Sequence, residues 1–286
     1  ITAGYVRQLG YAARAHFCGE SDLDLAQAAL NAGLIGLREG KLSAPFVGDD
    51  IALAVVTTDL VAATDQPLAP GALSSWQGIG PYLGRGGTRP QGKRLDGRHR
   101  PLHKGRYPME AIRRREAPTT YISDSVPRMP KRANFFTRAL HGDLGPKPKA
   151  ERQRFATKTP SSFSYIPLIQ GMARLQTGEP ASDTDPSSHD PMANALSMKA
   201  LATALGGDMA GTCAVPDYAW YSHQEDGKPI ETYHKNALVI LVDQGFETME
   251  GASGDDWISG AQSMRAYMRG AEIAGVIADQ IRRRGW

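Results

Sequence analysis

The sequence predicts an α+β protein built from two partial units and an irregular connector. Three observations lead to this class. The last stretch, 259–286, has the periodicity of a long amphipathic helix, and two aliphatic runs, 51–57 and 237–242, are typical of buried strands. Over 71–160 periodicity largely fails, and Gly and Pro punctuate the segment. The predicted parts are 1–70, a connector over 71–164, and 165–286.

The final helix has the clearest pattern. On a wheel of 3.6 residues per turn, one stripe holds Arg265, Arg269, Glu272, Asp279 and Arg283, and the opposite side holds Tyr267, Ala271, Ala274, Ala278 and Ile281. Ser259 with Gln262 three residues later predicts a capping box at the start. Gly285 after a run of arginines predicts the end.

Tyr267 is the only large polar residue on the predicted buried side of this helix. Its neighbours one and two turns later are alanines, so another group must fill the space beside them. A buried phenol also needs a hydrogen-bond partner. Two interpretations are open: a structural hydroxyl bonded to a carbonyl, or a functional hydroxyl facing a ligand.

The other elements follow from caps, breakers and runs of apolar residues. Asp190 followed by Pro191 predicts a helix that ends at Gly206, and Ser21 with Asp24 predicts another that ends near Gly33. The connector has helical candidates at 109–115 and 133–140. The remaining expected elements are a helix end over 1–9 and strands at 11–16, 51–57, 209–215 and 237–242.

Composition excludes several classes. Of 286 residues, 41% are hydrophobic and 22% charged, as in ordinary globular proteins, and no apolar run approaches the roughly 18 residues of a membrane span. Cys18 and Cys213 are far apart and neither belongs to a CxxC motif, so this chain cannot by itself ligate an iron–sulfur cluster or a Cys-rich zinc site. Sparse cysteine usage favours a reducing, cytoplasmic location.

Charge is distributed unevenly. Residues 71–160 hold 20 Lys and Arg against 6 Asp and Glu, a net charge of +14, whereas the rest of the chain carries −11. A basic arm for nucleic acid is one interpretation. However, Leu, Tyr, Phe and Met recur through the segment, which favours a belt packed on the acidic outer parts, so nucleic acid is not an expected partner.

A short internal repeat suggests duplication. Residues 6–11 and 281–286 share the order aliphatic, Arg, two long residues, Gly, aromatic. Both copies fall at a predicted helix end. A duplicated protein would explain this, with the chain beginning in the middle of one copy and ending at the same point of the next, as an internal fragment.

Several segments together resemble the reductive dehalogenase family, in particular its soluble, catabolic, cobalamin-dependent type. They are Gln262-Ser263-Met264-Arg265-Ala266-Tyr267 with the helix that follows, Ala32-Gly33-Leu34-Ile35-Gly36, Val56-Thr57-Thr58-Asp59-Leu60 and Pro67-Leu68-Ala69-Pro70. The resemblance implies nitroreductase-like corrinoid-binding units, three-layered with helices around a central sheet. Under it, 1–70 is the back half of a degenerate first unit, and 165–286 is the front half of the second, cofactor-binding unit.

The resemblance also implies a chemistry. Such enzymes hold cobalamin and two iron–sulfur clusters, and they remove halide from aromatic compounds with electrons from a donor protein or a fused reductase domain. Tyr267 falls on the position of the family's proton-donating tyrosine. The cluster ligands and the charged partner of this tyrosine are expected outside this chain. A phenol close to a cation has a lowered pKa and is a suitable acid.

Other candidates carry less specific patterns. Tyr221, Ser222 and His223 lie in a predicted loop between two strands, either as an exposed turn or near a cofactor edge. No metal is expected, because no metal-ligand spacing joins His189, Asp190, His223, His234 and Asp243. The alternative function is a non-catalytic scaffold or binding module, including nucleic-acid binding through the basic connector.

Overall fold

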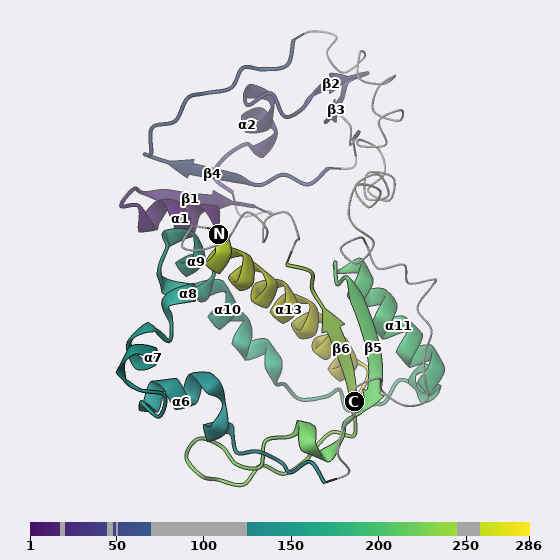
Figure 1. Ribbon diagram of the computed structural model, residues 1–286. Helices are drawn as coiled ribbons and strands as arrows, with labels where there is room; N and C mark the ends of the chain where they lie inside the picture. The colour runs from purple at the N-terminus through teal and green to yellow at the C-terminus, as the bar shows by residue number, and fades with distance from the viewer. Residues whose placement is uncertain (18–20, 45–47, 50, 70–124, 245–257) are drawn as a thin grey trace, which may run out of the picture. The chain divides into compact units, whose positions relative to one another are not determined.

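A computed structural model describes residues 1–17, 21–44, 48, 49, 51–69, 125–244 and 258–286 (Figure 1). The chain divides into two compact units, one of residues 2–116 and one of residues 117–286 together with Ile1. The expected helix at 109–115 lies outside the described residues.

The N-terminal unit contains short elements. They are α1 (Thr2–Gln8), β1 (Ala13–His16), α2 (Leu25–Asn31), β2 (Gly36–Arg38), β3 (Lys41–Ser43) and β4 (Val55–Thr58). β1 pairs antiparallel with β4, so that Ala13 lies opposite Thr58, and β2 pairs antiparallel with β3. The helix end at 1–9 and the strand at 11–16 are therefore confirmed.

The strand expected at 51–57 is shorter and less buried than predicted. β4 begins only at Val55, and Thr57 and Thr58 are exposed. Among the described residues β4 pairs with β1 alone, and none of its four residues is fully buried. An aliphatic run shows what a segment can bury, but not how many layers surround it.

The cap of α2 is Asp24, not Ser21 as the sequence predicted. The Asp24 carboxylate accepts the backbone N–H groups of Ala26 and Gln27, both at 3.0 Å, whereas the Ser21 hydroxyl accepts from Leu23 N in the preceding turn. Gly33 ends this helix with φ 65°. A Cβ there would lie 2.3 Å from the Gln66 carbonyl oxygen, so the glycine lets two segments of the family resemblance pack against each other.

The C-terminal unit is mainly helical. Its α-helices are α6 (Phe135–His141), α7 (Pro146–Glu151), α8 (Arg154–Thr157), α9 (Pro160–Phe163), α10 (Ile166–Met172), α11 (Pro191–Ala204) and α13 (Ile258–Arg283). Its 3-10 helices are η3 (Lys131–Ala133), η4 (Ala173–Gln176), η5 (Pro186–His189) and η6 (Asp217–Ala219). Its strands are β5 (Met209–Ala214) and β6 (Asn236–Leu241).

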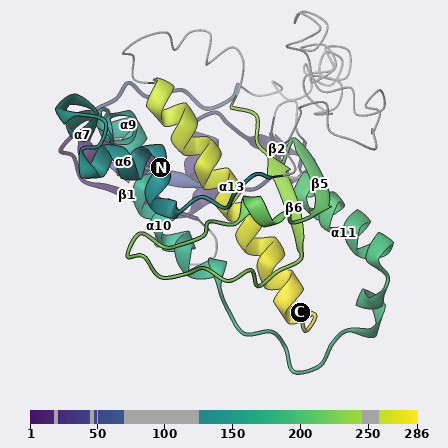
Figure 2. The same cartoon turned by 60° about the horizontal axis from the view of Figure 1, so that its bottom comes forward.

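The long helix α13 runs through the middle of this unit (Figures 1 and 2). α8, α9, α10 and η4 pack on it, as do α11 and β6. Asp190 caps α11 through the backbone N–H groups of Met192 and Ala193, with Pro191 in the first turn, as the sequence predicted. None of the described helices is both long and apolar enough to span a membrane.

β5 and β6 form an antiparallel pair in which Met209 lies opposite Leu241 and Ala214 opposite Asn236. One face of the pair packs on the core formed by Ala202, Ile273 and Ile277, through side chains that include Leu238 and Ile240. The other face is open, since Val239 is 51% and Leu241 54% exposed. The strand predicted over 237–242 is therefore present as β6, but the described residues cover it on one side only, so it is less buried than predicted.

The buried side of α13 also differs from the prediction. Ile273 and Ile277 are 0% and 3% exposed, whereas Tyr267 is 59% exposed and Ala274 is exposed. A wheel with one wet and one dry face fails here because elements pack on this helix from more than one direction. The predicted capping box is wrong too, because the helix already begins at Ile258 and Ser259 lies inside it.

The predicted end of α13 is confirmed. Gly285 has φ 82°, its N–H donates to Arg282 O, and Trp286 N–H donates to Ile281 O, which is a Schellman motif. The first copy of the repeat has the same two bonds around Gly10. So do the ends of α2 at Gly33 and α6 at Gly142. A common helix-ending geometry therefore accounts for the repeat without requiring duplication.

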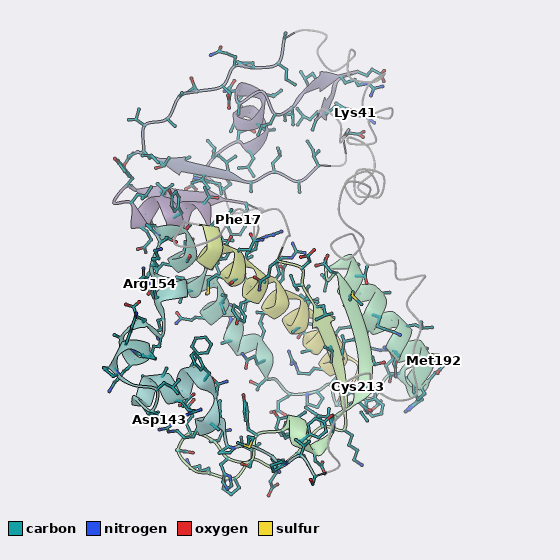
Figure 3. All side chains as sticks on the ribbon, viewed as in Figure 1. Phe17, Lys41, Asp143, Arg154, Met192 and Cys213 are labelled. Atoms are coloured by element: carbon teal, nitrogen blue, oxygen red, sulfur yellow. The ribbon has the colours of Figure 1, made fainter. Side chains whose placement is uncertain are left out.

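Residues 125–164, expected to be part of the connector, form η3 and the helices α6 to α9 (Figure 3). The helix expected at 133–140 is confirmed as α6. Arg132 donates to both carboxylate oxygens of Asp143, at 2.7 and 2.9 Å, across this helix. These hydrogen bonds from Arg132 lower the pKa of Asp143. α8 and α9 contact α13, so this part of the connector belongs to the same compact unit.

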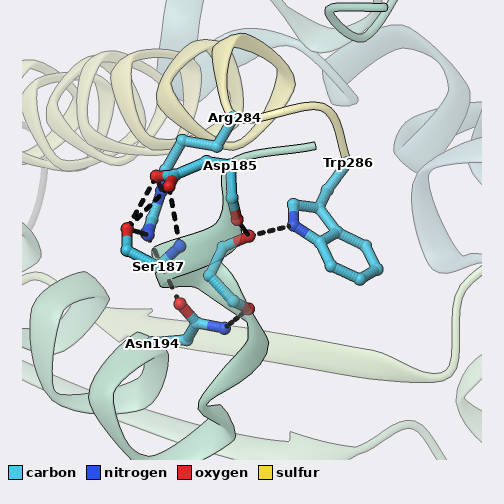
Figure 4. A network of polar contacts seen from close by, with 6 residues as sticks. Asp185, Ser187, Asn194, Arg284 and Trp286 are labelled. Carbon is cyan, nitrogen blue, oxygen red and sulfur yellow. Dashed lines mark hydrogen bonds and ion pairs between the residues drawn. The ribbon is translucent and has the colours of Figure 1, made fainter. Parts of the chain in front are cut away.

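A polar network attaches the end of α13 to the segment that precedes α11 (Figure 4). Arg284 donates from Nε to Asp185 (2.9 Å) and from Nη2 to Ser187 Oγ (3.0 Å), and Trp286 Nε1 donates to Ser188 Oγ (2.7 Å). Hydrogen bonds from Ser187 and Arg284 lower the pKa of Asp185 to about 2. The network fixes the direction in which α13 leaves the core.

Candidate functional site

An open apolar groove of about 910 Å³ lies between α13 and the helices α6, α8, α9 and α10 of the C-terminal unit. Its apolar lining is Phe136, Leu140, Phe163, Ile166, Pro167, Ile169, Met264 and Ala271. Its polar lining is Thr137, Arg152, Gln153, Thr157, Gln170 and Tyr267. Mostly apolar concave surfaces with a few polar groups are typical of ligand sites.

Local sequence signals set the walls of the groove. Asn134 caps α6 by accepting the N–H of Phe136 (3.0 Å), and Thr159 caps α9 by accepting the N–H of Ser162. Pro167 occupies the first turn of α10, where its missing N–H costs nothing. Each wall is thus a short helix with a defined start, held against α13 or beside it.

Tyr267 belongs to the α13 wall, together with Met264 and Ala271. Its side chain is 59% exposed, and among the described residues no group forms a hydrogen bond with its hydroxyl. Within the described part of the chain, Tyr267 is therefore not a structural phenol bonded to a carbonyl. The hydroxyl is available to a ligand in the groove.

Two arginines of α13 lie close to Tyr267 in sequence, and each has another role. Arg269 Nη2 donates to the carbonyl of Gly206 (2.9 Å), at the end of α11, where a cation also complements the helix dipole. Arg265 acts on Tyr165: burial raises the pKa of Tyr165, and the Arg265 charge opposes this rise. The described residues thus supply Tyr267 with no ion-pairing cation.

Tyr221, Ser222 and His223 do not line the groove. They lie in a turn that is attached to the segment before α6: Ser222 N–H donates to Met129 O, and Lys131 N–H donates to His223 O, both at 2.9 Å. Tyr221 is 40% exposed, and Asn134 Nδ2 donates to its hydroxyl at 3.4 Å. Tyr221 therefore touches the cap of a groove wall rather than the groove itself.

Sequence reasoning missed most of the groove. Phe136, Thr137 and Leu140 come from the segment that was interpreted as an irregular connector. The available signal was the helical candidate at 133–140, in which adjacent phenylalanines precede a buried alanine, Ala139. Such a short helix does not reveal from sequence which long helix it will face.

The described residues suit an apolar ligand better than a metal ion. No three His, Cys, Asp or Glu side chains in the described ranges lie together as a metal site. Cys213 on β5 is free and exposed, and the whole chain has two cysteines, which do not fit a four-cysteine iron–sulfur cluster. The groove fits better with a flat, largely apolar ring, because aromatic and aliphatic side chains dominate its lining.

Solved structures of reductive dehalogenases match nearly the whole chain, with 47–49% identity over 96–99% of its residues. The chain belongs to the reductive dehalogenase family, as the sequence motifs indicated. The matched structures include the catabolic reductive dehalogenase NpRdhA, at 49% identity over 99% of this chain with a TM-score of 0.85. The same protein in complex with 3-bromo-4-hydroxybenzoic acid matches 96% of this chain with a TM-score of 0.82.

A further structure, reported to suggest a mechanism for B12-dependent dehalogenation, is 47% identical over 99% of this chain, with a TM-score of 0.82. This chain spans 40–42% of the length of these structures. No family model and no curated protein matches the sequence. The matches give no support to a scaffold or nucleic-acid-binding role.

Proposed function

We propose that this chain forms part of a cobalamin-dependent reductive dehalogenase that removes halide from halogenated aromatic compounds, with Tyr267 as the proton donor. The observation that carries the proposal is the Tyr267 hydroxyl in an apolar groove, to which no described residue is hydrogen-bonded, in a chain that is 49% identical to a reductive dehalogenase. That relative has been solved with a brominated hydroxybenzoate bound.

The reaction replaces a carbon–halogen bond with a carbon–hydrogen bond. It consumes two electrons and one proton and releases a halide ion. Cobalamin, when bound, supplies the electrons through its metal. The protein must supply the proton. Tyr267 carries one on a hydroxyl to which no described residue is hydrogen-bonded.

The other groove residues suit an aromatic ligand. Phe136 and Phe163 offer aromatic surfaces, and Met264 and Ala271 leave an apolar face beside the tyrosine. Such a lining favours a flat, largely apolar ring. The small side chain of Ala271, one turn after Tyr267, leaves room close to the phenol.

The finer organisation is also a proposal. In it, residues 1–70 and 165–286 are halves of two nitroreductase-like units, and residues 71–164 connect them. Two iron–sulfur clusters, whose ligands lie outside this chain, would pass electrons from a donor protein or a fused reductase domain. Tyr221, Ser222 and His223 would act on the site indirectly, through the α6 wall.

The test is Tyr267→Phe in the complete enzyme that contains this chain, with Tyr218→Phe as the matched control. A proton donor is needed only in the chemical step, so Tyr267→Phe should keep its cobalamin content and melting temperature while turnover falls by roughly 10² or more. Tyr218→Phe should keep turnover near normal, because Tyr218 is exposed, does not line the groove, and its hydroxyl forms no hydrogen bond within the described ranges.

Cobalamin content, melting temperature and turnover of bromophenol should be measured together. Normal turnover in Tyr267→Phe would refute the assigned role. A lowered melting temperature with normal turnover would instead identify Tyr267 as a packing residue.

A further inference from the structure

Arg128 connects two parts of the C-terminal unit that are distant in sequence. Its guanidinium donates to three backbone carbonyls: Nη2 to Tyr221 O (2.6 Å) and to Ile230 O, and Nε to Trp220 O (3.4 Å). Within the described ranges it forms no ion pair with a carboxylate. A guanidinium whose hydrogen bonds all go to backbone carbonyls holds the backbone in place and does not neutralise an acidic side chain.

The three carbonyls belong to one hairpin, residues 220–230. Gln224 N–H donates to Lys228 O (2.8 Å) at its turn, and Ile230 N–H donates to Ser222 O (2.9 Å) between its arms. Gly227, with φ 85°, closes the turn. Because Arg128 reaches carbonyls at both ends of the hairpin, it holds the two arms together as well as attaching them to the 128–131 segment.

The hairpin in turn supports the α6 wall of the groove. Asn134, the cap of α6, donates to the Tyr221 hydroxyl (3.4 Å), and the Thr137 hydroxyl donates to Glu225 (3.3 Å). Thr137 itself lines the groove, as does Phe136 beside it. The bonds therefore run from Arg128 through the hairpin to side chains of the wall.

We propose that Arg128 is a positioning residue of the groove: by fixing the hairpin 220–230, it sets where the α6 wall stands opposite Tyr267. The inference rests on the proposed function only in taking the groove as the ligand site. α6 has two short turns and little buried surface, since among its residues only Thr137 and Ala139 are buried. A helix of this length does not hold its place without such outside attachments.

The experiment uses the complete enzyme that contains this chain, with ¹³C-methyl-labelled methionine and 4-bromophenol as the probe. Met264 lines the groove on the α13 side, so its methyl resonance reports on probe binding without being part of the hairpin or of α6. Arg128→Ala should weaken 4-bromophenol binding at Met264 about tenfold, the scale expected when several hydrogen bonds to one support are lost.

Two further variants separate positioning from charge and from folding. Arg138→Ala removes an exposed arginine of α6 that forms no side-chain bond among the described residues, and it should change the affinity less than twofold. Arg128→Lys keeps the charge but offers one ammonium in place of a fork that reaches three carbonyls, so it should weaken binding about threefold. Millimolar guanidinium should restore much of the affinity of Arg128→Ala, since it can refill the vacated site.

The outcomes distinguish the two proposals. If the wild-type enzyme binds 4-bromophenol at Met264 and both Arg128 variants bind equally well, the positioning role is wrong and the groove remains the ligand site. If the wild-type enzyme shows no binding at Met264, the groove is not the ligand site and the positioning role falls, whereas the role of Tyr267 is decided separately by the turnover of Tyr267→Phe. If Arg128→Ala does not fold, Arg128→Lys decides; unfolding of both would show that Arg128 supports the whole unit rather than the groove.

Discussion

At Gly285 backbone geometry and close packing combine, and replacement of this glycine gives a measurable prediction. Its φ of 82° lies in the left-handed region, where a non-glycine residue costs about 1–2 kcal/mol. A Cβ at this position would also lie 2.5 Å from Asp183 O and 2.7 Å from Thr184 Cα, both backbone atoms that cannot rotate away.

To relieve this overlap, the end of α13 must move away from the segment 181–185. That movement stretches two backbone hydrogen bonds, from Ala181 N to Arg282 O (2.8 Å) and from Asp185 N to Arg284 O (3.0 Å). At about 1 kcal/mol each, these bring the expected cost of Gly285→Ala to about 3–4 kcal/mol.

Gly142→Ala is the matched control. Gly142 ends α6 with the same Schellman bonds and φ 86°, but a Cβ there would meet only the flexible side chain of Lys149, at 3.6 Å. Its cost should be the conformational term alone, about 1–2 kcal/mol. Urea unfolding followed by far-UV circular dichroism measures both. Equal losses in the two variants would refute the claim that close packing at Gly285 adds to the conformational cost.

Two other predictions follow from the charges and the cysteines. The pKa of Asp185 is about 2 in the folded state against its usual 3.8. Its carboxylate therefore stabilises the fold fully above pH 3.8 and loses this effect as the pH falls towards 2. Asp185→Asn should lower the melting temperature at pH 6, and the difference from the wild type should shrink between pH 4 and pH 2. A difference that stays constant over this range would exclude the ion pair as its cause. The chain by itself, given cobalamin and reduced ferredoxin, should not debrominate bromophenol, because two cysteines cannot ligate a four-cysteine cluster; measured bromide release would contradict this.

Features decided within a few residues were predictable from the sequence. The Asp190–Pro191 start of α11 and the Gly285 end of α13 were both correct, because a carboxylate at the cap and a glycine in the left-handed region act on their own backbone neighbours. The cap of α2 was missed by three residues. Ser21 and Asp24 are both good caps, and only the position of the first helical turn decides between them.

Features that depend on tertiary packing were not predictable in the same way. Tyr267 was placed on the buried side because alanines follow it at helical spacing, yet Ile273 and Ile277 are the residues that enter the core. The wheel shows which residues share a face but not which partner comes to that face. The groove walls formed by α6 and α10 were missed for the same reason. No pattern within 133–172 indicates that this segment packs beside 258–286.

The division between small buried and large exposed residues supports the groove as a functional surface. In α6, Ala139 is 1% exposed while Phe136 is 48% exposed; in α9, Ser162 is 1% exposed while Phe163 is 37% exposed. Burial of a phenylalanine contributes about 2 kcal/mol, so a sequence selected for the stability of these helices alone would turn the aromatic residues inward. Instead, small residues make the contacts that hold the helices, and the aromatic side chains line the groove with Tyr267. Apolar side chains around the Tyr267 hydroxyl, to which no described residue is hydrogen-bonded, lower the free energy of a flat apolar ligand bound there. This binding free energy compensates for the stability that the fold loses by leaving the aromatic side chains exposed.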